Sequence, residues 1–150
     1  EIFDYLYHSM RDLKKEVFKV IYLNSQNQII ETEDLFIGTV DKSAISPREV
    51  MERAIKHNAA SLIFVHNHPA GNPKPSLSDK ELTKDLLYAA SIMQIKVLDH
   101  IIIGNNTYFS FAGEGLIEEY RMGFLNIKIR DRANIKRSQY RAKLSDTKLY

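Results

Sequence analysis

The feature that most constrains the fold is an apolar run, Ser61–Val65, that stops in His66-Asn67-His68-Pro69. A short continuous apolar run is typical of a strand buried on both faces. Pro69 ends this strand because it has no backbone N–H, and the prolines and glycine that follow predict a chain reversal. A helical pattern then covers Ser78–Ser91. The segment therefore predicts a buried strand, a stiff turn and a helix.

The rest of the chain extends this unit to the order β-β-α-β-α-β-β, with one helix before it and one after it. We expect strands at Glu16–Asn24, Ile29–Val40, Ser61–Val65, Ile95–Gly104 and Thr107–Phe111, and helices at residues 1–12, 46–58, 78–91 and 114–123. The first two strands should pair antiparallel. Ser46 is the expected N-cap of the second helix. For the third helix, Ser78 with Glu81 and Ser76 with Asp79 both fit a capping box. This order predicts an α/β fold, a mixed central sheet flanked by helices.

The chain of 150 residues suits one domain, which we place at residues 1–123. Residues 1–12 form the leading helix and are expected to be a remnant of a longer protein. Residues 124–150 are expected to be a basic, partly ordered C-terminal extension. In its first part, FLNIKIR, polar and apolar residues alternate as they do in a strand. Such an edge strand would allow two chains to pair into an oligomer.

Charge is unevenly distributed. Residues 121–150 hold nine Lys or Arg and two Asp, a net charge of +7, within a chain whose net charge is +2. A basic tail on a mildly acidic body predicts a contact with nucleic acid, although many charge runs are only solvated.

Composition excludes several classes of protein. The chain has no cysteine, which rules out disulfides, thiolate metal sites and a cysteine nucleophile. No apolar run approaches the roughly 18 residues that a membrane span requires. We therefore expect a cytoplasmic protein with no membrane contact.

The residues after the buried strand suit a metal. Side chains at i and i+2 of an extended chain point the same way, so His66 and His68 can approach one point. Asp79, in the first turn of the next helix, can supply a carboxylate. Two imidazoles and a carboxylate are a common ligand set for catalytic zinc.

The string HNHPAGNPKPSLSD resembles the JAMM motif of the JAB1/MPN metalloproteases, with His66, His68, Ser76 and Asp79 at its four positions. Together with GTVDKSAISPREV and VLDHIIIG, it is similar to the bacterial RadC family, long labelled DNA repair proteins, over about Arg11 to Phe111. The resemblance implies a three-layer JAB/MPN (cytidine-deaminase-like) fold. It also implies a zinc hydrolase that cleaves peptide or isopeptide amide bonds.

The same resemblance implies a role for each residue. His66, His68 and Asp79 would bind Zn²⁺, Ser76 would donate a hydrogen bond to the oxyanion, and Glu16 would be the general base. Glu49 is the rival base. His100 either supports the metal ligands or, as we favour, forms a core pair with the adjacent Asp99.

Three other functions are weighed against the zinc hydrolase. The alternative is a DNA-binding or DNA-repair accessory protein in which the basic tail, residues 121–150, binds nucleic acid and the metal site is secondary. An HNH nuclease is not favoured, because that motif disperses its three letters over a longer unit. A zinc deaminase is excluded because its motif needs cysteines.

Overall fold

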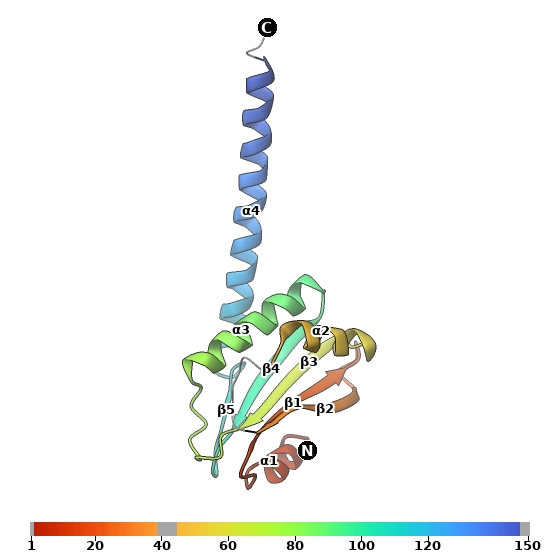
Figure 1. Ribbon diagram of the computed structural model, residues 1–150, viewed down its shortest axis with the longest axis vertical. Helices are drawn as coiled ribbons and strands as arrows, with labels where there is room; N and C mark the ends of the chain where they lie inside the picture. Colours follow the sequence, from red (N-terminus) through yellow and green to blue (C-terminus); the bar gives the residue numbers. More distant parts are fainter. Residues whose placement is uncertain (1, 39–44, 148–150) are drawn as a thin grey trace.

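A computed structural model describes residues 2–38 and 45–147 (Figure 1). Its elements are α1 (Ile2–Met10), β1 (Glu16–Leu23), β2 (Ile29–Gly38), α2 (Pro47–Lys56), β3 (Ser61–Asn67), α3 (Leu77–Ile92), β4 (Lys96–Ile103), β5 (Tyr108–Ser110) and α4 (Leu116–Thr147). The predicted order of strands and helices is confirmed. Val40, the expected end of the second strand, lies outside the described residues.

The five strands form one mixed sheet in the order β2-β1-β3-β4-β5. β1 is antiparallel to both β2 and β3, β3 is parallel to β4, and β4 is antiparallel to β5. The predicted antiparallel pair and the predicted mixed α/β class are therefore confirmed. The parallel pair β3 and β4 lies at the centre and carries the two histidine segments.

Helices cover both faces of the sheet, which gives three layers (Figure 1). On one face, Phe18, Val20 and Phe64 pack with α2, α3 and the start of α4. On the other face, Val17, Ile21 and Val65 pack with α1. Because strand side chains alternate between faces, His66 continues the α3 side of β3 and Asn67 continues the α1 side. The pleat therefore separates two adjacent polar residues at the end of one strand.

Glu33 of β2 ties the sheet to α2. Its carboxylate lies 2.8 Å from Nε2 of His57 and 2.8 Å from Nη1 of Arg53. Burial raises the pKa of Glu33, but the hydrogen bond from His57 and the charge of Arg53 lower it, so that this pKa lies below its ordinary value. The ion pair with Arg53 and the hydrogen bond with His57 hold α2 over the edge strand.

Two predictions about the C-terminal region are wrong. The helix does not close at Gly123, and residues 124–130 are not a strand, because α4 runs unbroken from Leu116 to Thr147. The domain boundary expected at residue 123 thus falls inside a helix. A Cβ at Gly123 would lie 3.0 Å from the Tyr88 hydroxyl, so this glycine serves close packing against α3.

The start of α3 also differs from one expectation. Ser76 is the N-cap, and the capping box joins Ser76 to Asp79 rather than Ser78 to Glu81. The capping box therefore fixes Ser76 and Asp79, two of the four motif residues, at the start of α3.

Among the described residues, no helix is both long enough and apolar enough to cross a bilayer. The expected cytoplasmic location stays a prediction.

Candidate metal centre

The two motif histidines meet at the end of β3. His66 is the sixth residue of the strand, and His68 follows just beyond it, where its backbone N–H still donates to the carbonyl of Ile103 in β4. This bond keeps the chain extended past the end of β3. The Nε2 atoms of His66 and His68 lie 3.0 Å apart. The predicted convergence of the two imidazoles is confirmed.

Asp79 reaches the same point from the first turn of α3. Its carboxylate oxygens lie 3.3 Å from Nε2 of His66 and 3.3 Å from Nε2 of His68, and its side chain is 1% exposed. The capping box orients this carboxylate. Asp79 accepts the backbone N–H of Ser76 at 2.7 Å, and the Ser76 hydroxyl accepts the backbone N–H of Asp79 at 3.0 Å. A cap common to many helices here aims a carboxylate at two imidazoles.

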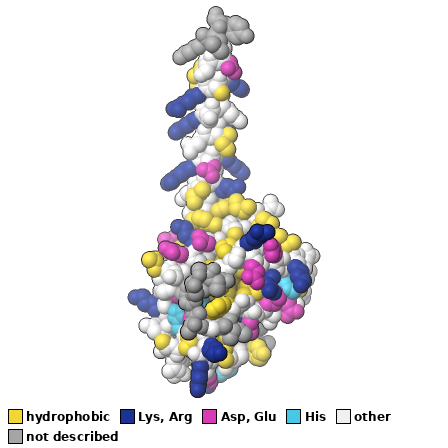
Figure 2. Space-filling model, in the orientation of Figure 1, with side chains coloured by type: hydrophobic (Ala, Val, Ile, Leu, Met, Phe, Trp, Pro, Cys, Tyr) yellow, Lys and Arg dark blue, Asp and Glu magenta, His cyan; other side chains and the backbone are white. Residues whose placement is uncertain are grey.

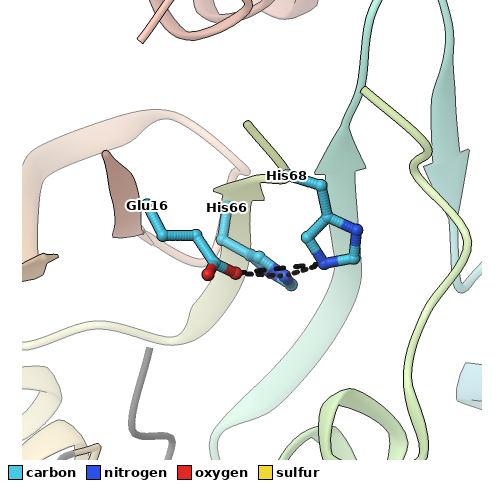
Figure 3. A group of neighbouring side chains, drawn as sticks. All are labelled: Glu16, His66 and His68. Carbon is cyan, nitrogen blue, oxygen red and sulfur yellow. Dashed lines mark hydrogen bonds and ion pairs between the residues drawn. The ribbon is translucent and has the colours of Figure 1, made fainter. Parts of the chain in front are cut away.

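Glu16, the first residue of β1, also points its carboxylate toward the two histidines (Figure 3). Its Oε1 atom lies 3.7 Å from Nε2 of His66 and 3.9 Å from Nε2 of His68. Glu16, His66 and His68 form a group whose candidate ligand atoms all lie within 4.8 Å of one another. Two carboxylates therefore face the histidine pair, with Asp79 closer than Glu16.

The hydrogen bonds behind the imidazoles determine which nitrogen of each ring carries the proton. Nδ1 of His68 lies 2.8 Å from the carbonyl oxygen of Asn72. A carbonyl can only accept, so Nδ1 of His68 must be the donor. The Nε2 atom of neutral His68 then presents its lone pair to the site, as metal ligation requires.

His66 is oriented by a longer chain of bonds. The Thr83 hydroxyl donates to the Asp79 carbonyl oxygen at 2.7 Å and lies 2.6 Å from Nδ1 of His100. We assign the hydroxyl proton to the carbonyl, which can only accept, so that Thr83 accepts from His100. His100 is fully buried among Phe18, Phe64 and Phe111, which favours the neutral ring.

Neutral His100 therefore accepts at Nε2, which lies 2.7 Å from Nδ1 of His66. His66 must then carry its proton on Nδ1 and present its Nε2 lone pair to the site. Both imidazoles are thus held in the form that binds a cation. Such bonds behind metal-ligating histidines are a regular feature of metal sites.

The pKa of His68 reflects this arrangement. Burial lowers it, but the hydrogen bond to Asp79, the Asn72 carbonyl and the charges of Asp79 and Glu16 raise it, and the net pKa lies above its ordinary value. The two carboxylates therefore favour positive charge beside His68, whether a proton or a bound cation supplies it.

Asn67 fixes the position of Glu16 from the opposite face of the sheet. Its side-chain oxygen accepts the backbone N–H of Val17 at 2.7 Å, and its amide donates to the carbonyl of Lys15 at 3.0 Å. These two backbone groups lie on either side of Glu16. The residue between the two histidines therefore anchors β1 at the point where Glu16 leaves it.

A small, mainly apolar pocket adjoins Glu16, His66 and Asp79. Its other lining residues are Val17, Phe18, Phe36, Ile45 and Leu82. Apolar walls lower the local dielectric, so charges at the site interact more strongly than they would in water.

The structure gives the position of each of the five site residues predicted from sequence, and their chemical roles stay predictions. Glu16, His66, His68 and Asp79 converge, whereas Ser76 is exposed at the cap of α3. The rival base, Glu49, pairs with Arg53 on the exposed side of α2. His100 is not a side-chain partner of Asp99, since Asp99 bonds the His100 backbone and Ser110.

Three supporting residues were missed or misjudged from sequence: Asn67, Thr83 and His100. The sequence held a signal for two of them. Adjacent strand residues point to opposite faces, which argues against a side-chain pair of His100 with Asp99. Thr83 follows Asp79 by four residues and therefore lies on the same face of α3.

The sequence of this chain is similar to those of several known proteins. Residues 1–116 match the sequence model of a family described as RadC-like JAB domain. The chain is 51% identical over 116 residues to UPF0758 protein PSHAa2643 of Pseudoalteromonas translucida, covering 77% of this chain and 52% of that protein. It is 46% identical over 114 residues to UPF0758 protein YeeS of Escherichia coli, covering 76% and 77%.

A third relative, a UPF0758 protein of Trichlorobacter lovleyi, is 44% identical over 117 residues, or 78% of this chain and 51% of that protein. The chain thus spans about half the length of the Pseudoalteromonas and Trichlorobacter proteins. The family match ends at residue 116, where α4 begins.

Proposed function

Because this chain belongs to the family of RadC-like JAB domains, we propose that it is a zinc-dependent hydrolase of the JAMM type, which cleaves an amide bond of a peptide or isopeptide. The observation that carries the proposal is the convergence of two imidazole lone pairs on one point beside two carboxylates. An ordinary buried histidine cluster has no need to hold both rings in the ligating tautomer.

The donor set fits zinc. Two ligand atoms of one tetrahedral zinc, each about 2.0–2.1 Å from the ion, lie roughly 3.3 Å apart. The corresponding separations here are 3.0 Å between the two Nε2 atoms, 3.3 Å from Nε2 of His66 to Oδ1 of Asp79, and 3.3 Å from Nε2 of His68 to Oδ2 of Asp79. His66, His68 and Asp79 would therefore hold the ion. A bound zinc would polarise the substrate carbonyl and lower the pKa of water.

Glu16 is the proposed general base. Its Oε1 atom stands at 3.7 and 3.9 Å from the two Nε2 atoms, farther than Asp79, which suits a group that handles a proton rather than a ligand. In this role, Glu16 takes a proton from the attacking water and delivers it to the departing amine. Asn67 keeps the carboxylate in place through the backbone on each side of it.

Ser76 is the proposed donor to the oxyanion. Its hydroxyl oxygen already accepts the Asp79 backbone N–H, yet a hydroxyl that accepts with its oxygen can also donate its own proton. Its position at the N-terminus of α3 also favours a developing negative charge.

The test compares two glutamate variants of the zinc-reconstituted protein on fluorogenic peptide and isopeptide substrates. Glu16→Gln should keep the zinc and lose turnover by about 10²- to 10⁴-fold, the usual contribution of a general base. Glu49→Gln is the matched control and should retain turnover. Full turnover by Glu16→Gln, or loss of turnover in Glu49→Gln alone, would reverse the assignment of the base.

A further inference from the structure

Helix α4 leaves the domain as a rod (Figure 1). Its first turns belong to the core, where Leu116, Ile117 and Tyr120 pack, and Phe124 lies 5.6 Å from the ring of Tyr88 in α3. From Leu125 to Thr147, every described side chain is exposed. A helix this long and this polar has no stability from packing in the isolated chain, so its face chemistry indicates what it contacts.

Charge is segregated around the exposed part of α4. Figure 2 shows Lys and Arg side chains along both sides of the rod. The exposed part holds seven basic residues. At 3.6 residues per turn, six of them fall into two rows that lie about 140° apart around the helix axis, and the seventh, Lys128, lies on the opposite half of the helix. One row is Arg132, Lys136 and Lys143, and the other is Arg130, Arg137 and Arg141. The two acidic residues of this part, Asp131 and Asp146, lie on the opposite half of the helix.

An apolar stripe runs between the two basic rows. Ile129, Ala133, Tyr140 and Leu144 are separated by four, seven and four residues, which places them on one helix face. Ile129, Tyr140 and Leu144 are exposed. We call the stripe and its two flanking rows the basic face of α4.

We propose that the basic face of α4 binds double-stranded DNA, with the helix in the major groove. An α-helix with its side chains is about 10–12 Å wide, close to the roughly 12 Å width of that groove. The two basic rows then face the phosphates on the two sides of the groove, and the apolar stripe faces the base edges. This inference is independent of the metal site and of residues 1–116, which carry the family match.

Two other occupants suit the face less well. A second copy of the helix would bring basic rows against basic rows with no acidic side chain between them, which opposes a coiled coil. An anionic membrane requires a wide apolar face, whereas this stripe has only three bulky apolar residues and is bordered on both sides by basic residues.

The test measures binding of the full chain to a labelled DNA duplex of about 20 base pairs, or two helical turns, by fluorescence anisotropy. Six phosphate contacts predict a slope of log K against log salt concentration of about −5, and a loss of about 10³-fold in affinity between roughly 50 and 200 mM salt. The triple variant Arg132→Gln, Lys136→Gln and Lys143→Gln should reduce the magnitude of this slope by about three.

The matched control is Lys14→Gln, Arg48→Gln and Lys56→Gln, which removes the same charges from exposed positions on the domain. It should leave the slope unchanged. The proposal fails if the duplex does not bind at low salt, or if the control loses as much as the α4 variant. It also fails if vesicles containing phosphatidylserine bind more tightly than DNA, or if sedimentation reveals a dimer that the α4 variant breaks.

Discussion

Replacing Thr83 by valine tests whether the buried bonds behind His66 prepare the site for a cation. Valine has the shape of threonine but no hydroxyl. In the protein as it stands, Thr83 accepts from His100, His100 accepts from His66, and the Nε2 lone pair of His66 is left for a ligand. Without the hydroxyl, Nδ1 of His100 has lost its acceptor and its proton can move to Nε2. His66 would then carry its own proton on the nitrogen that faces the site.

The expected cost has two parts. A buried donor left without its partner costs about 1–3 kcal/mol of folding free energy. Loss of a group that orients a metal ligand reduces metal affinity by about 10- to 100-fold, or about 1.4–2.7 kcal/mol. Thr83→Val should therefore weaken zinc binding by this factor while leaving all three proposed ligands in the protein.

Competition with a fluorescent zinc chelator measures the affinity, and urea unfolding of the metal-free protein measures the stability. Ser91→Ala is the matched control, because the Ser91 hydroxyl donates to the carbonyl of Leu87 in the same helix, four residues back and far from the site. This control should change zinc affinity by less than the Thr83 variant does. Zinc affinity of Thr83→Val within twofold of wild type would refute the argument from tautomers.

Three further outcomes are expected. Asn67→Ala should destabilise the protein by about 1–3 kcal/mol in urea unfolding, because two backbone groups lose their hydrogen-bond partner. It should also lower turnover, because Glu16 is no longer held in place, while zinc content is unchanged. Normal turnover would contradict this prediction. Ser76→Ala and Ser46→Ala each remove a helix N-cap and should each cost about 1 kcal/mol, but only Ser76→Ala should also reduce turnover. The pKa of Glu33 is lowered in the folded state, so the stabilisation from its carboxylate is present above the ordinary pKa of 4.5 and is lost as pH falls through the folded pKa. Glu33→Gln should therefore reduce the fall in unfolding free energy at acid pH. An unchanged pH dependence in the variant would contradict this prediction.

The sequence predicted the local contacts, and the family resemblance added Glu16, but the other distant contacts were missed. The spacing of His66, His68 and Asp79 fixes them on one strand end and one helix start, so the motif alone places them together. The bond between Asn67 and Val17 joins residues 50 apart, and that between His66 and His100 joins residues 34 apart. Such pairs depend on strand order, which the motif does not contain.

The prediction for the C-terminal region was wrong for a different reason. Gly123 suggests a helix end, and FLNIKIR alternates like a strand, yet both lie inside α4. At Gly123 the reason is tertiary packing, because the Tyr88 hydroxyl of α3 occupies the space beside this glycine. The segment from Leu125 to Arg130 is exposed, so its apolar alternation does not correspond to a buried strand face.

Zinc content, measured by mass spectrometry on protein purified without a His-tag or added metal, tests the central claim most directly. The wild type should hold about one zinc per chain, as a site with one set of ligands requires. His68→Ala should lose the ion, whereas His8→Ala, which removes an exposed histidine from α1, should keep it. Wild-type protein without zinc even after reconstitution, or equal zinc in the wild type and His68→Ala, would contradict the account.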